Sequence, residues 1–368
     1  MIHNRKIPPL ISIIRKGGSQ RQSNFELLRI VSMLAIICYH LCWHTRQYFI
    51  GVDKYIADFI TSFTLVHVSL FVLISGFFSI KLKWKSIFKI IAVCMLIGIP
   101  LYLIGAELKY YPYHNKDLIH LLFPFTFNNW WFIKVYLQLM LFSPLLNIYV
   151  ENISKEQLKK TLLWLTAILL FIGGIFHDGL DDRGTNILHF SLLYLIGRYL
   201  RLYPSFYNKI DKKILRKKCL SIYFVCSACS MLLAILSSFH KMPFELYSSP
   251  FVIVAAVAVF IIFTTFSFQN RTINFMATSA LIVYMIHDEA GLSRPMLSAL
   301  MGKLYMNIGT FYFLLVPLIS LLIYGIGTVA DIIVIRPLMN LLEIIFCRRD
   351  YFSLVRNNIQ QRSFYKQL

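Results

Sequence analysis

The stretch NFELLRIVSMLAIICYHLCWHT, residues 24–45, has the length and apolarity of a membrane-spanning helix but carries two unexpected ionisable side chains. About twenty consecutive apolar residues are enough to cross the hydrocarbon core of a bilayer. Arg29 lies near the start of this stretch, and His40 lies eleven residues later. Because ionisable groups are costly inside a bilayer, each of them needs a partner or a function.

The rest of the chain is as apolar as this stretch. Of its 368 residues, 58% are hydrophobic and only 15% are charged, which is too little charge for the surface of a soluble protein of this length. The apolar runs are continuous rather than alternating, which favours helices over a β-barrel. The sequence therefore predicts an all-α, polytopic membrane protein with about ten transmembrane helices.

The apolar runs define the expected spans and domain limits. The spans are expected at 27–48, 56–80, 86–106, 130–150, 160–176, 186–204, 217–238, 247–268, 272–291 and 310–335. We expect a basic tail at 1–24, a transmembrane domain at 25–340 and a second basic tail at 341–368. A re-entrant or interfacial helix is expected in DLIHLLFPF, residues 117–125. The segment RPLMNLLEIIFCRRDYF, residues 336–352, is expected to form an interfacial amphipathic helix followed by a basic tail.

Lysine and arginine residues are unevenly distributed between alternate loops. They concentrate in the two tails and in the loops after the second, fourth and sixth spans, and they are sparse elsewhere. Because positively charged loops stay inside, both termini are expected in the cytoplasm. The net charge of +20 largely reflects this bias, and it implies contact with anionic membrane lipids. No nucleic-acid partner is expected, because the basic residues are dispersed over short loops.

Arg29 and His40 share one face of the first expected helix. Eleven residues make about three helical turns, which leaves the two side chains within roughly 20° of each other and about 16 Å apart along the axis. Arg29 alone is explained by snorkelling to the headgroups, and His40 by a hydrogen bond to a neighbouring helix. The pair in register favours a function. Glu26, three residues before Arg29, can pair with it there or form only a helix-end salt bridge.

Four stretches together resemble the membrane acyltransferase 3 family. The first is FELLRIVSMLAIICYH, with an acidic residue, an arginine, ten residues and a histidine, which is the most specific motif. The others are HVSLFVLISGFF at 67–78, NWWFIKVYLQLMLFSPLLN at 129–147 and SALIVYMIH at 279–287, in family order over most of the chain. Many members have a histidine where this chain has Asn129, so the role of that histidine is not carried over.

This resemblance implies an O-acyltransferase in a bacterial plasma membrane. Such an enzyme takes an acyl group, usually acetyl, from acyl-coenzyme A on the cytoplasmic side. It passes the group to a hydroxyl of a surface polysaccharide or of its lipid-linked precursor. Acetyl-coenzyme A would therefore be a co-substrate, and no permanently bound cofactor is expected.

The phosphates of coenzyme A call for cations at the cytoplasmic face. The candidates are Arg29, Lys81, Lys83 and Lys85. The three lysines are explained equally well as markers of the cytoplasmic side. Ser75 and Gly76 would let the pantetheine arm approach the backbone closely, or they are small residues that pack helices together.

His40 is the expected catalytic residue. A sugar hydroxyl needs a base when it attacks a thioester, and histidine is suited to that role. Alternatively, His40 itself receives the acyl group before passing it on, and the sequence leaves both mechanisms open. His287 is expected at a similar depth, where it orients the acceptor, polarises His40 or is a solvated interfacial residue. His44 is assigned to an outer vestibule, and His67 to packing.

Trp130 and Trp131 begin the fourth expected span at the outer surface. Tryptophans at that height normally form the interfacial aromatic belt. A platform that stacks on the sugar acceptor, with Asn129 beside it, is the alternative. No metal site is expected from the spacing of histidine, cysteine and carboxylate residues, and HDGLDD at 177–182 lacks the remaining ligands of a calcium loop.

Two other classes of function compete with the enzyme. A carrier or exporter of lipid-linked glycans would line its path with Arg29 and His40, but the sequence shows no convincing repeat of the kind that transporters often contain. A structural scaffold leaves the aligned pair unexplained. The sequence therefore favours the acyltransferase.

Overall fold

The computed structural model describes residues 21–124, 126, 130–171, 182–237 and 246–344. The described chain is 84% helical and contains no strand. Its first seven helices are α1 (Ser23–Trp43), α2 (Asp53–Thr64), α3 (His67–Phe78), α4 (Trp84–Glu107), α5 (Asn115–Leu122), α6 (Trp131–Asn152) and α7 (Lys155–Ile168). They are followed by α8 (Ile187–Leu202), α9 (Ser205–Asn208), α10 (Lys212–Ser237), α11 (Pro250–Thr264), α12 (Arg271–Ala277), α13 (Ala280–His287), α14 (Ser293–Ile308) and α15 (Tyr312–Ala330).

Six helical segments within the described ranges are long and apolar enough to cross a membrane. They are Ser23–Tyr48, Asp53–Phe78, Trp84–Glu107, Trp131–Asn152, Lys212–Leu236 and Ser293–Ile344. Helices also occupy the remaining expected spans, but they are shorter, as in the fifteen residues of α11. The chain is therefore a multi-pass helical membrane protein, and the number of about ten spans and the cytoplasmic termini stay predictions.

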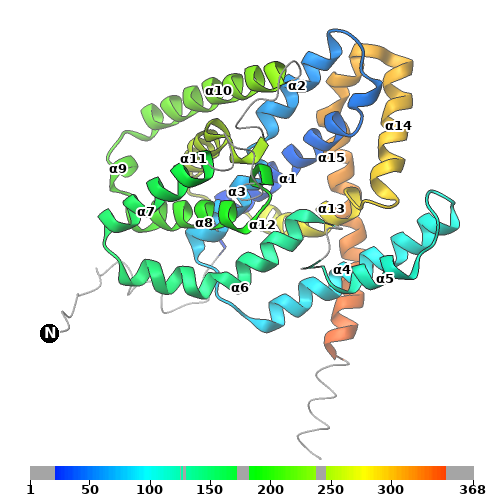
Figure 1. Cartoon of the computed structure of the whole chain (residues 1–368), viewed down its shortest axis with the longest axis horizontal. Coiled ribbons are helices and arrows are strands. Elements are labelled where there is room, and N and C mark those ends of the chain that lie inside the picture. The colour runs from blue at the N-terminus through cyan, green and yellow to red at the C-terminus, as the bar shows by residue number, and fades with distance from the viewer. Residues whose placement is uncertain (1–20, 125, 127–129, 172–181, 238–245, 345–368) are drawn as a thin grey trace, which may run out of the picture.

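Helix α1 lies in the middle of the bundle, and α10 and α14 lie at its periphery (Figure 1). Around α1 pack α2, α3, α11, α12, α13 and α15. Helices α3 and α8 approach especially closely through two glycines. A Cβ atom on Gly76 would lie 2.2 Å from the carbonyl oxygen of Tyr194, and one on Gly197 would lie 2.5 Å from that of Leu73. Small residues allow such close packing of helices in a membrane.

The outer surface of α15 is apolar. Leu314, Leu318 and Leu322 repeat every four residues along one side of this helix, and all three are exposed. An apolar stripe of this kind on a soluble protein would need a partner. In a membrane it faces the lipid chains, which agrees with the multi-pass assignment.

Two expected spans are interrupted in the structure. The span at 56–80 consists of α2 and α3, which meet at Leu65 and Val66. The hydroxyl groups of Thr61 and Thr64 donate to carbonyls of the preceding turn, a pattern that bends helices. The span at 272–291 likewise consists of α12 and α13.

The sequence-based expectation for the region after residue 291 was wrong in two places. Helix α14 occupies residues expected to form a loop, because Arg294 and Lys303 interrupt its apolar pattern without preventing a helix. The expected separate helix from 336 instead continues α15 as far as residue 344, through a π-helical turn. In that turn Arg336 donates to Asp331, five residues earlier, at 2.9 Å, which suits the five-residue π repeat.

Candidate active site

Helix α1 carries an ion pair near its first turn. Nη1 of Arg29 donates to both carboxylate oxygens of Glu26, at 2.9 and 3.1 Å. The Glu26 side chain is buried and that of Arg29 is about one-third exposed, at 35%. The pair is therefore half open to the surroundings, and the charge of Arg29 is already balanced within the helix.

Near the other end of α1, His40 is buried in a cluster of polar side chains. Its Nδ1 lies 3.1 Å from Nε2 of His287, the last residue of α13. Asp288 follows directly, and its Oδ1 lies 3.6 Å from Nδ1 of His40 and 3.3 Å from Nε2 of His44. Nε of Arg294, in α14, donates to the same Asp288 oxygen at 2.9 Å. Segments some 250 residues apart in the sequence thus meet at one carboxylate.

The hydrogen bonds determine which nitrogen of His40 is basic. Nδ1 of His287 lies 2.7 Å from the carbonyl oxygen of Val283, which only accepts, so this nitrogen carries a proton. In a neutral His287, Nε2 must then accept, and Nδ1 of His40 donates to it. This arrangement leaves Nε2 of His40 unprotonated. His40 is thereby oriented as a base with its lone pair directed away from the cluster.

The turn between α13 and α14 is held by the carboxylate of Glu289. It accepts from the backbone N–H groups of Gly291 at 2.7 Å and of Leu292 at 2.6 Å. These N–H groups lie at the start of α14, where intrahelical partners are lacking and a carboxylate is stabilising. Glu289 therefore fixes the short connection on which Asp288 is presented to His40.

A family model described as an acyltransferase domain, Acyl_transf_3, matches residues 22–336. The chain belongs to the acyltransferase 3 family. Neither a curated protein nor a solved structure matches the chain. Both ends of α1 and the whole histidine cluster lie within the matched residues, so the clustered side chains are those of a membrane acyltransferase.

In this acyltransferase, several polar groups around the cluster have no hydrogen-bond partner. Both ring nitrogens of His67 and the hydroxyl of Tyr284 are buried and unpartnered within the described part of the chain. His67 packs edge-on against Tyr39, with ring centroids 5.3 Å apart, and Tyr39 lies beside His40. Buried polar groups normally have partners, so these atoms are suited to contact a bound polar molecule.

Trp130 does not form an outer aromatic belt or a sugar platform. Its side chain is buried, and Nε1 donates to the carbonyl of Met285 at 3.1 Å. It therefore holds α13 two residues before His287. Trp131 is partly buried and packs on Tyr247, with ring centroids 5.2 Å apart. Asn129 lies outside the described residues.

Some of the residues expected to bind the donor already have partners within the protein. Lys81 and Lys83 are exposed, and Lys85 lies 3.5 Å from the carboxylate of Glu343. The Ser75 hydroxyl donates to the Phe71 carbonyl at 2.9 Å and lies 3.2 Å from the hydroxyl of Tyr136.

The backbone of α8 occupies the space beside Gly76. A pantetheine arm therefore cannot approach there. The geometry at this position supports the alternative in which Gly76 packs helices together.

His40, His44 and Asp288 also have the composition of a metal site, which the sequence did not lead us to expect. One ligand atom from each lies within 4.8 Å of the others. However, the Asp288 oxygen already accepts from the guanidinium of Arg294, which would repel a second cation. The present contacts are those of a hydrogen-bonded relay, and we assign the three residues to it.

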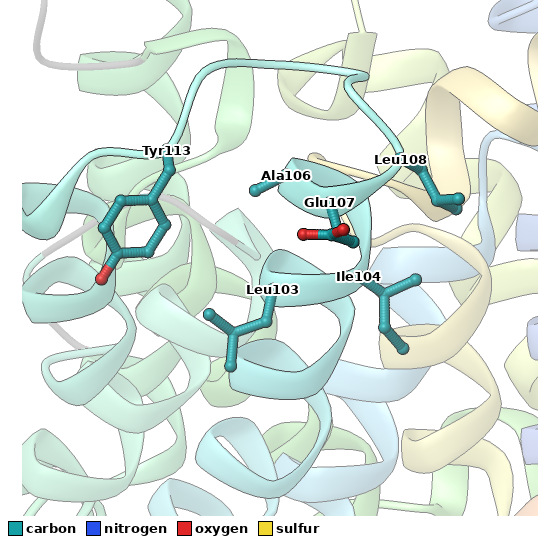
Figure 2. Close-up of a pocket in the computed structure, with 6 residues that line it drawn as sticks. All are labelled: Leu103, Ile104, Ala106, Glu107, Leu108 and Tyr113. Atoms are coloured by element: carbon teal, nitrogen blue, oxygen red, sulfur yellow. The ribbon is translucent and has the colours of Figure 1, made fainter.

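A separate pocket of about 550 Å³ lies at the end of α4 (Figure 2). It is lined by Leu103, Ile104, Ala106, Glu107, Leu108 and Tyr113. Tyr111, from the loop that follows α4, packs against Gly291 in the turn that presents Asp288. One loop therefore borders both the pocket and the histidine cluster.

Proposed function

We propose that this membrane acyltransferase transfers an acetyl group from acetyl-coenzyme A to a hydroxyl of a surface polysaccharide or of its lipid-linked precursor. The observation that carries the proposal is the orientation of His40. Its Nδ1 is engaged by His287, and its Nε2 is left as a base. A base in that state is what a hydroxyl needs to attack a thioester.

The proposed reaction is direct transfer. Nε2 of His40 takes the proton of the acceptor hydroxyl while the hydroxyl oxygen bonds to the acetyl carbonyl carbon. The carbon–sulfur bond then breaks, and the leaving thiolate recovers the proton from His40. Asp288, 3.6 Å from Nδ1 of His40, stabilises the positive charge that the imidazole carries in between. An acetyl-imidazole at His40 is the alternative course.

The proposed topology brings the donor from the cytoplasm of a bacterial cell. The distribution of lysine and arginine favours the Glu26–Arg29 end of α1 inside and the His40 end towards the outer surface. Arg29 would meet the donor at the cytoplasmic end. The pantetheine arm would extend along α1 for about 16 Å towards His40. The acceptor would come from the outer side.

The decisive experiment replaces His40 with Gln. We expect kcat for acetyl transfer from labelled acetyl-coenzyme A to fall by about 10² to 10⁴, the usual contribution of a catalytic base. His114→Gln is the matched control, because His114 is exposed and lies in the loop before α5. Purified protein in nanodiscs with isolated surface polysaccharide gives the rate, and release of free thiol gives an independent measure.

The same variant separates the enzyme from a glycan exporter. In cells, His40→Gln should remove acetyl groups from the polysaccharide while the amount of exported polymer stays normal. Loss of the polymer itself, at normal membrane levels of the variant, would favour the exporter. Unchanged acetylation would remove His40 from the mechanism.

A further inference from the structure

Arg198, in α8, is a buried cation with no carboxylate at ion-pair distance among the described residues. The residue is 9% exposed, and its Nε has no hydrogen-bond partner. Its guanidinium also makes no ion pair within 4.0 Å in the described ranges. Guanidinium groups carry five donors, and an unpaired buried charge costs several kcal/mol. The position therefore calls for an anion.

A second cation that makes no ion pair with the described residues lies on the same face of α8. Arg201 follows Arg198 by three residues, and its guanidinium carbon lies 5.0 Å from the centre of the Phe77 ring. The two arginines repel each other electrostatically, as like charges at this spacing do. Arg201 also lies in the last turn of the helix, where a cation is favoured, but this position does not explain the buried Arg198. An anion between the two would remove the repulsion.

Further cations come from the connection between α3 and α4. Tyr194 is one turn before Arg198, and its hydroxyl accepts from the backbone N–H of Ile80 at 3.1 Å. The same hydroxyl donates to the Asn147 side chain at 2.7 Å. These bonds hold the connection beside α8, and Lys81 follows Ile80 directly. Positive charge from two segments is therefore concentrated at this end of the bundle.

This basic group lies close to the Glu26–Arg29 end of α1. Phe77, beneath Arg201, packs on Phe25 of α1 with ring centroids 5.1 Å apart. Arg29 is already engaged by both oxygens of Glu26. The carboxylate that interacts with Arg198 is that of Glu151, which is not within ion-pair distance. The charge of Arg198 is thus less balanced by a carboxylate than that of Arg29.

We propose that Arg198 and Arg201 form a phosphate-binding site, and that its ligand is the phosphate end of the acyl donor. Planar guanidinium groups bind phosphate oxygens through two parallel hydrogen bonds, and this geometry suits a ligand with several phosphates. The identity of the donor rests on the proposed function. The phosphate of an anionic lipid has the same chemistry, and the experiment separates the two sources.

The test measures binding of coenzyme A and of adenosine 3′,5′-bisphosphate to the full chain in nanodiscs of uncharged phosphatidylcholine. For Arg198→Gln we expect the Kd of both ligands to rise about tenfold or more, the effect of one lost charge-assisted bond. The KM for acetyl-coenzyme A should rise with it, and kcat should change little. Arg271→Gln, at an exposed arginine at the start of α12, is the matched control.

Two further measurements keep the outcomes separate. Retention of phosphatidylglycerol by wild type and Arg198→Gln is compared by native mass spectrometry. If wild type binds no coenzyme A, the proposed function fails, and reduced lipid retention in the variant would still support a phosphate site. Unchanged binding of both coenzyme A and lipid would overturn the site. Should Arg198→Gln not fold, Arg201→Gln is expected to weaken binding in the same direction, and its failure to do so would count equally against the site.

Discussion

The two ends of helix α1 are held in different ways. Glu26 and Arg29 form a pair within one helical turn, and the pair is partly open. His40 is held by groups from α13 and α14, more than 240 residues away in the sequence. The first contact forms as soon as the helix forms. The second requires the assembled bundle, so the geometry at His40 is fixed by tertiary packing.

This difference matches the two proposed tasks. A ligand at the Arg29 end competes with a single carboxylate, and it can bind and leave without disturbing other helices. At the His40 end, movement of one ring would disturb the contacts of His287, Asp288 and Arg294 together. An open pair suits reversible binding, and a buried network suits a reaction that depends on orientation.

Asp288→Asn should cause the largest of the effects that test this difference. The substitution keeps the shape of the side chain but removes the charge that stabilises protonated His40. We expect kcat to fall by about 10- to 100-fold, and KM for the donor to stay the same. The acid limb of the pH–rate profile should move to lower pH, because the imidazolium loses a stabilising anion.

The control for this substitution is Asp211→Asn, directly before α10. Asp211 is exposed, and its side chain accepts from the backbone N–H groups of Lys213 and Ile214, far from the histidine cluster in the sequence. A kcat within twofold of wild type and an unshifted profile are expected there. If Asp288→Asn behaved in the same way, the carboxylate would have no part in orienting or stabilising His40.

The same difference explains what the sequence can and cannot predict. The all-helical class follows from continuous apolar runs, and the Glu26–Arg29 pair follows from a spacing of three residues. The role of Asp288 does not follow from the sequence, because its partner Arg294 comes from α14 and its partner His44 directly follows α1. Helix α14 was itself missed, since its charged residues conceal its helical character. The similar depth expected for His40 and His287 indicated that the two residues are close. Their hydrogen bond, however, depends on the position at which α13 ends.

The sequence was equally unable to predict the direction of the Trp130 side chain. The position of the residue at the start of a span indicates the membrane interface, where tryptophan normally lies. In the structure the ring turns inward, where Nε1 donates to the carbonyl of Met285 in α13. Sequence position determines the depth of a residue in the membrane. Packing between helices determines the side to which it points.

A second prediction concerns the Glu26–Arg29 end of α1. Arg29→Gln leaves the buried carboxylate of Glu26 without its cation, and we expect a loss of about 1–3 kcal/mol in stability. Adding Glu26→Gln should restore most of it, because both charges are then removed. Thermal unfolding in nanodiscs measures this cycle.

The donor KM separates binding from stability at this end. If Arg29 contacts the donor, KM should stay raised in the double variant even where stability is restored. If KM recovers together with stability, Arg29 acts only as the partner of Glu26. Glu156→Gln, at an exposed carboxylate in the first turn of α7, is the control.

The smallest expected effect tests how Trp130 supports the His40 end of α1 through α13. Trp130→Phe keeps an aromatic ring in the core but removes the donor to the carbonyl of Met285. We expect a loss of about 1 kcal/mol in stability, measured by thermal unfolding. Trp164→Phe is the matched control because Trp164 is exposed on α7. Because Met285 lies two residues before His287, kcat should also fall in the Trp130 variant with donor KM unchanged. A lower stability with normal kcat would mean that α13 keeps His287 in place without this bond.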